Sequence, residues 1–166
     1  MPVATQASAI QVLLQDLHLR LAGCSEGAVA DYIPELAKAC TEDFGIVVAM
    51  ADGRIYEVGD TDKLFTIQSI SKPFAYGLAL QKLSLDYMQR KVGVEPSGEA
   101  FNAISLDPAT GIPRNPMINA GAIATSAQIQ QFAGADAEAL LLDYFSQLAG
   151  RSLDRSEEHT SELQSP

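Results

Sequence analysis

The sequence predicts one domain of mixed α and β structure, an α/β fold of the α+β kind. Two runs of apolar and β-branched residues flank Asp52-Gly53, a strong turn signal, and predict an antiparallel hairpin. Leucine-rich segments with helical spacing lie before and after this hairpin and predict several helices. The third observation is an apolar segment near Ser69, which predicts a helix buried inside the domain.

The first helix is expected over residues 7–22, because apolar side chains recur there at spacings of three and four. These side chains are Ile10, Leu13, Leu14, Leu17 and Leu21. A second, short helix is expected from Pro34 to Thr41, since proline suits the first helical position and Leu36, Ala37 and Cys40 would form one apolar face.

The hairpin is expected to pair residues 44–50 with residues 54–58, and residues 59–62 would close it. A short third strand over residues 64–67 would then lead to Ser69. Three strands form a thin sheet, and a domain of this kind normally has more strands.

Ser69 lies three residues before Lys72, where the apolar helix from Ile70 to Leu80 begins. Residues three apart share one helix face, and Pro73 places the helix start close to Ser69 because proline is tolerated only in the first turn. A serine there would have the free N–H groups of a helix N-terminus beside it, and a desolvated lysine would be a base for its proton. The four residues alone equally fit an ordinary N-cap serine.

Three more helices are expected in the second half of the chain, over residues 83–92, 120–132 and 136–150. In the first of them Leu85, Met88 and Val92 would point inward, and the apolar residues of the last are Leu140, Leu141, Tyr144, Phe145 and Leu148. Between the first two of them, residues 95–119 are rich in Pro, Gly and Asn. So long an irregular stretch in a compact domain is usually functional.

The composition argues against nucleic acid and anionic membranes as partners. The chain has 166 residues, a formal net charge of −10 and no cluster of lysine and arginine, so a small solute is expected as its ligand. Cys24, Cys40, His18 and His159 lack metal-binding spacing, and the two thiols should be buried or half-buried. With neither a signal-peptide pattern nor a membrane-spanning stretch, the cytoplasm is the expected compartment.

Four further side chains are candidates for chemistry. Gln68 precedes Ser69 directly. Tyr32 could equally be a packing residue, Asn115 before a proline could form a turn, and Asn119 could be an N-cap.

Five ordered blocks of sequence resemble the glutaminase family. They are residues 30–37, Gly59-Asp60, residues 65–72, residues 95–102 and residues 115–123. The resemblance runs from the first helix to about Asp154. It implies the fold of the serine β-lactamases and penicillin-binding proteins.

The resemblance implies hydrolysis of L-glutamine to L-glutamate and ammonia, without a metal or an organic cofactor. Ser69 would attack the side-chain carboxamide, Lys72 would activate Ser69, and a glutamyl ester would form and then be cleaved by water. Tyr32 would be a site tyrosine in catalysis and binding, Asn119 a substrate-binding asparagine, and Gln68 a neighbour of the nucleophile that faces the substrate. The resemblance further implies a homotetramer for the full-length parent protein.

The resemblance also implies a division of the chain. Residues 1–154 would be the N-terminal part of a single glutaminase domain. Residues 155–166 have no helical or strand period and resemble a translated sequencing adapter, so we expect them to be a non-native tail. On this interpretation the 166-residue chain would be inactive, with apolar surface of Phe74 and Leu78 left uncovered.

Two alternatives remain. One is a penicillin-recognising serine hydrolase or esterase that uses the same S-x-x-K helix, although the S-x-N and K-T-G elements of such enzymes are absent from the sequence. The other is a non-catalytic binding or oligomerisation module of the same fold.

Overall fold

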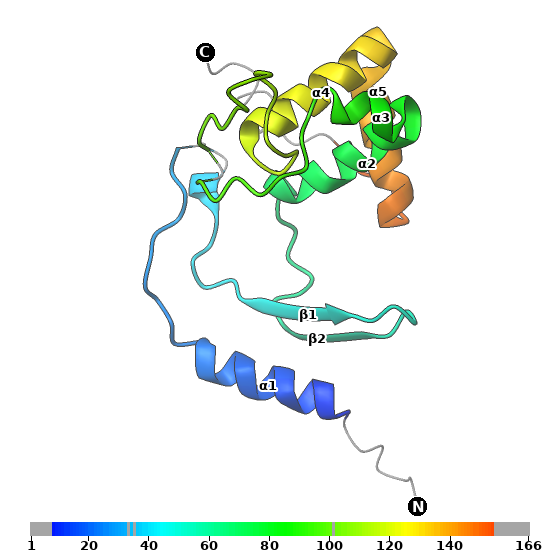
Figure 1. Ribbon diagram of the computed structural model, residues 1–166. Helices are drawn as coiled ribbons and strands as arrows, with labels where there is room; N and C mark the ends of the chain where they lie inside the picture. Colours follow the sequence, from blue (N-terminus) through cyan, green and yellow to red (C-terminus); the bar gives the residue numbers. More distant parts are fainter. Residues whose placement is uncertain (1–7, 33, 35, 101, 155–166) are drawn as a thin grey trace, which may run out of the picture. The chain divides into compact units, whose positions relative to one another are not determined.

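Two compact units make up the chain, one extending to Phe65 and the other beginning at Thr66. The computed structural model describes residues 8–154 except 33, 35 and 101 (Figure 1). The tail over residues 155–166 lies outside the described residues, so its interpretation stays a prediction. No helix in the described part of the chain is both long and apolar enough to span a membrane.

The first unit contains a helix and a hairpin. Helix α1 (Ala9–Leu21) is followed by strands β1 (Gly45–Ala49) and β2 (Ile55–Gly59), which pair antiparallel with Gly45 opposite Gly59. Figure 1 shows α1 running alongside the hairpin, and Gln11 of α1 donates from Nε2 to the Glu57 carbonyl at 2.9 Å. The predicted first helix and hairpin are confirmed.

The hairpin turn has three residues between Met50 and Arg54, one more than the Asp52-Gly53 signal alone suggests. The Gly53 N–H donates to the Met50 carbonyl at 3.0 Å, and Gly53 has a φ of 88°, which a residue with a Cβ rarely adopts. This is the pattern of a type I turn closed by a left-handed glycine. The Asp52 carboxylate accepts from the Arg54 backbone N–H and from its Nε, which holds the turn.

The base of the hairpin explains the Gly59-Asp60 pair. Gly59 has a φ of 81°, and a Cβ there would collide with the Phe44 carbonyl and the His18 ring, which stacks on Phe44 at a centroid distance of 4.8 Å. Asp60 accepts from the Phe44 N–H with its carboxylate and returns its own N–H to the Phe44 carbonyl. These two residues therefore fasten the hairpin.

The second unit is helical. Its α-helices are α2 (Ser71–Leu83), α3 (Leu85–Gln89), α4 (Asn119–Ala133) and α5 (Ala137–Ala149), grouped together in Figure 1. The 3-10 turns η2 (Gln68–Ile70) and η3 (Gly134–Asp136) precede α2 and α5. The core of this unit consists of Leu78, Ala79, Met88, Val92, Ile129 and Ala137. The predicted helices of this half are thus present, with a break at Ser84 (φ 74°) that shortens the helix expected over residues 83–92.

Two predicted elements are wrong. Residues 64–67 form no strand, and Leu64 and Phe65 are more than 80% exposed, so their apolar character does not reflect pairing in a sheet. The helix expected from Pro34 to Thr41 is reduced to a single 3-10 turn, η1 (Leu36–Lys38), because its apolar side chains are few and mostly exposed.

Several burial predictions are also wrong. Cys24 and Cys40 are exposed free thiols. Leu85 is 52% exposed because it is the first residue of the short α3 and is not part of the core that buries Met88 and Val92. Leu78, expected to be uncovered, is 1% exposed within the helical core, whereas Phe74 is 40% exposed.

Candidate functional site

Ser69 lies in the 3-10 turn η2, directly before α2. The turn passes into α2 through helical conformations at Ile70 and Ser71, so Ser69 and Lys72 lie three residues apart on a continuous helical backbone. Pro73 falls in the first turn of α2, as its missing N–H requires. Ser69 is exposed and Lys72 is half-buried. A serine nucleophile must be accessible to its substrate, and an amine that is to act as its base should be partly desolvated.

Gln68 adopts an uncommon backbone conformation directly before Ser69. Its φ is 45°, in the left-handed region that residues with a Cβ rarely occupy. Its side-chain Nε2 donates to the Thr66 hydroxyl at 3.1 Å, and its carbonyl accepts from the Ser71 hydroxyl at 2.7 Å. Ser71 is not among the residues predicted for the site, and its only signal in the sequence is a second serine within the Ser69–Lys72 segment.

Lys72 and Asn119 are brought together from segments 47 residues apart in the chain. Lys72 Nζ donates to Asn119 Oδ1 at 2.6 Å. Asn119 is the first residue of α4, and the residue before it, Ile118, takes the N-cap position. The alternative of Asn119 as an N-cap is therefore wrong, because its side-chain oxygen faces the lysine amine.

Asn115 forms a turn, which was the alternative to a role in the chemistry. Its Oδ1 accepts from the backbone N–H groups of Met117 (3.0 Å) and Ile118 (3.2 Å), while its Nδ2 donates to the Glu95 carbonyl (2.9 Å). This turn fixes the chain just before α4. It thereby fixes the backbone that carries Asn119.

Gly121 allows the start of α4 to pack directly on that turn. A Cβ at this position would collide with the Asn115 carbonyl and would lie 2.9 Å from Pro116 Cα. Only glycine fits such a close approach of two backbones. Sequence reasoning did not single out Gly121, and its one signal was a glycine in the first turn of a predicted helix, where glycine is unfavourable.

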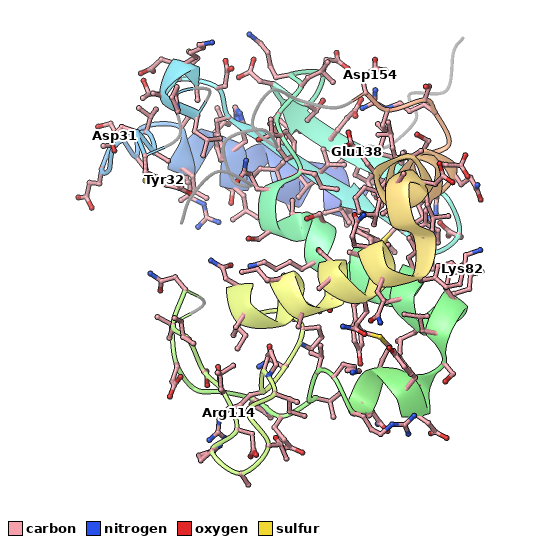
Figure 2. The ribbon with its side chains drawn as sticks, turned by 90° about the horizontal axis from the view of Figure 1, so that it is seen from above. Asp31, Tyr32, Lys82, Arg114, Glu138 and Asp154 are labelled. Atoms are coloured by element: carbon pink, nitrogen blue, oxygen red, sulfur yellow. The ribbon has the colours of Figure 1, made fainter. Side chains whose placement is uncertain are left out.

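The irregular stretch before α4 is ordered by its own backbone. The Gly93 and Glu95 N–H groups donate to the Pro113 and Arg114 carbonyls, and Figure 2 shows Arg114 on this loop. The Asp107 carboxylate accepts from the hydroxyl and N–H of Thr110, and the hydroxyl holds the pKa of Asp107 below its usual range. These hydrogen bonds order the loop, and the ordered loop positions the start of α4.

Tyr32 belongs to the first unit, whereas the other candidates belong to the second. It lies in a bend after α1, next to Asp31 (Figure 2), and its side chain is 75% exposed. The packing alternative for Tyr32 is wrong because so little of the ring is buried. Its role at the site remains a prediction.

Two further observations concern titratable groups among the described residues. In the described ranges there is no group of three or more His, Cys, Asp and Glu side chains that could hold a metal ion. On α2, burial raises the pKa of Tyr76, and its hydroxyl has no hydrogen-bond partner among the described residues. The site candidates of the second unit carry a hydroxyl (Ser69), an amine (Lys72) and side-chain amides (Gln68 and Asn119). That set suits acyl transfer through a serine nucleophile.

A family model described as Glutaminase matches residues 27–165 of the chain. A glutaminase of Nostoc sp. is 49% identical over 141 residues, which are 85% of this chain and 42% of the relative. A glutaminase of Rhizobium leguminosarum bv. trifolii is 52% identical over 119 residues, 70% of this chain and 38% of the relative. The chain thus spans less than half the length of these curated relatives.

Solved structures give the same family. The crystal structure of Mglu in its tris and glutamate form has a TM-score of 0.82 and 38% identity, covering 95% of this chain and 36% of that one. The probable glutaminase from Bacillus subtilis, complexed with 6-diazo-5-oxo-L-norleucine, has a TM-score of 0.77 and 27% identity, covering 99% and 50%. The predicted serine β-lactamase-like fold agrees with these neighbours. The family model covers more than half of the chain and the sequence identities are high, so this chain belongs to the glutaminase family.

Proposed function

We propose that this chain provides the nucleophile and its base for the hydrolysis of L-glutamine to L-glutamate and ammonia. The observation that carries the proposal is the 2.6 Å hydrogen bond from Lys72 Nζ to Asn119 Oδ1, made one helical turn from the exposed Ser69. The family supports the substrate, because the chain matches the Glutaminase model and its structural neighbours include a protein solved in a glutamate form.

The chemistry follows from the groups present. Ser69 Oγ attacks the carbon of the substrate carboxamide while Lys72 Nζ, in its neutral form, takes the serine proton. The tetrahedral intermediate carries its negative charge on the former carbonyl oxygen, and the Ser69 N–H at the start of the helix is a donor for that oxygen. Lys72 returns the proton to the departing nitrogen, ammonia leaves, and water then cleaves the glutamyl ester.

The remaining candidates bind and orient. The side-chain oxygen of Asn119 accepts the hydrogen bond from the Lys72 amine. The side-chain N–H groups of Asn119 can then donate to an acceptor on the substrate. Gln68 precedes the nucleophile and has an amide for the same purpose. Tyr32 completes the proposed set, in catalysis and in binding. No metal or organic cofactor enters any step of this scheme.

The chain matches less than half of the length of its curated relatives, and this affects the activity expected of it. Because 141 matched residues make up 42% of the Nostoc relative, we propose that turnover needs the remaining part of that length and that the 166-residue chain alone is inactive. We also propose a homotetramer for the full-length form. The cytoplasm is the proposed compartment, and the free thiols Cys24 and Cys40 are typical of a reducing environment.

The test uses a joined protein, in which residues 1–154 are followed by the part of the Nostoc glutaminase beyond the matched region. It should release ammonia from L-glutamine, and Ser69→Ala should lower kcat at least about a thousandfold. A Ser69→Ala variant that keeps a tenth of the activity would refute the assignment. Hydrolysis of nitrocefin but not of glutamine would favour a penicillin-recognising enzyme, and silence with both would favour a binding module.

A further inference from the structure

The peptide group between Gln68 and Ser69 is held in an unusual orientation. Gln68 and Ser84 are the non-glycine residues with positive φ in the described part of the chain, and Gln68 directly precedes the proposed nucleophile. Ser84 (φ 74°, ψ 156°) separates α2 from α3 and is fifteen residues beyond Ser69 in the chain. Gln68 instead begins a 3-10 turn that continues into α2, where no helix end calls for a positive φ. Such a conformation persists only where the surroundings hold it.

Ser71 is the residue that holds the Gln68 carbonyl. Its hydroxyl donates to Gln68 O at 2.7 Å, and its backbone N–H donates to the same oxygen. A serine hydroxyl bonded to a carbonyl three residues earlier is common in helices. Here the carbonyl belongs to a residue outside the helical φ range, so the bond fixes an orientation that the helix by itself would not produce.

Fixing this carbonyl also fixes the Ser69 N–H. The peptide bond is planar, so the Gln68 C=O and the Ser69 N–H point in opposite directions from one rigid group. A donor on the carbonyl polarises the peptide and makes its N–H a stronger hydrogen-bond donor. In the proposed reaction this N–H stabilises the negative oxygen of the tetrahedral intermediate.

We propose that Ser71 is a positioning residue, whose hydroxyl holds the Gln68–Ser69 peptide so that the Ser69 N–H faces the developing oxyanion. This inference rests on the proposed glutaminase reaction. The negative oxygen exists only in the transition state and the intermediate, so loss of the Ser71 hydroxyl should lower kcat and leave KM nearly unchanged.

The test compares variants of the joined protein. Ser71→Ala should lower kcat about tenfold, the effect of losing one hydrogen bond, with KM within about twofold of the parent value. Ser71→Thr keeps the hydroxyl and should restore kcat to within about twofold. The matched control is Thr125→Val, which also removes a hydroxyl that donates to a backbone carbonyl, that of Gly121 at 2.9 Å, and should leave kcat unchanged.

A second measurement follows the backbone without any need for activity. In a crystal structure of the 166-residue chain with Ser71→Ala, the Gln68 φ should leave the left-handed region, whereas with Ser71→Thr it should stay there. A Gln68 φ that stays positive in Ser71→Ala overturns the inference.

Each kinetic outcome also decides the matter. A parental kcat in Ser71→Ala overturns the positioning role, and so does an equal loss of kcat in Thr125→Val, because that would be a general effect of lost stability. If the parent joined protein releases no ammonia, the proposed function itself fails before any Ser71 variant is compared, and the catalytic part of the inference falls with it.

Discussion

Gly121→Ala should disrupt the packing of the start of α4 against the Asn115 turn. The new Cβ would collide with the Asn115 carbonyl oxygen and would lie 2.7 Å from the Asn115 carbonyl carbon and 2.9 Å from Pro116 Cα. All of these are backbone atoms, which cannot rotate away as the end of a side chain can. Overpacking costs roughly 1–3 kcal/mol, and the rigid neighbours place this site at the upper end, about 3 kcal/mol. The start of α4 should move, taking Asn119 away from Lys72.

Gly77→Ala is the matched control. Gly77 lies inside α2, and a Cβ there would have Tyr144 Oη at 3.4 Å as its nearest neighbour. Replacing a helical glycine by alanine without a clash should stabilise the chain by about 0.5–1 kcal/mol. Urea denaturation followed by circular dichroism measures both changes in the free energy of unfolding. If Gly121→Ala were as stable as the parent, or no less stable than Gly77→Ala, the close packing of α4 on the Asn115 turn would be refuted.

Three other predictions follow from single contacts. Lys72→Arg should lower kcat of the joined protein nearly as much as Lys72→Ala, since a guanidinium cannot accept a proton, and an active arginine variant would show that only positive charge matters. Leu78→Ala, which removes a side chain that is 1% exposed, should cost about 2–5 kcal/mol of unfolding free energy in a urea titration, and a loss below 1 kcal/mol would contradict the core described for the second unit. The Thr110 hydroxyl lowers the pKa of Asp107, so this carboxylate stabilises the fold above its unfolded pKa and loses that effect as the pH falls through the folded value. Thr110→Val should therefore raise the pKa of Asp107 in an NMR titration, and an unchanged pKa would contradict this.

Local patterns predicted the elements whose determinants are close together in the sequence. The hairpin follows from alternation around Asp52-Gly53, and the helix at Ser69 follows from an apolar segment with Pro73 in its first turn. The third strand was wrongly predicted because apolar residues such as Leu64 and Phe65 look the same in the sequence whether they pair in a sheet or remain exposed.

Long-range contacts were beyond the reach of spacing arguments. The hydrogen bond between Lys72 and Asn119 joins residues 47 positions apart, and it forms only because the 29 residues between α3 and α4 return the chain to α2. The need for glycine at position 121 arises from the Asn115 backbone, which meets it only in the folded chain. The left-handed φ of Gln68 has no sequence signal, because glutamine is not a residue that favours it.

The central claim is that Ser69 is the nucleophile, and covalent labelling tests it most directly. The Bacillus subtilis relative was solved in complex with 6-diazo-5-oxo-L-norleucine, a reactive analogue of glutamine. Incubation of the joined protein with this compound, followed by peptide mass spectrometry, should place the adduct on Ser69, and Ser69→Ala should remain unlabelled. An adduct on any other residue, or equal labelling of Ser69→Ala, would contradict the account.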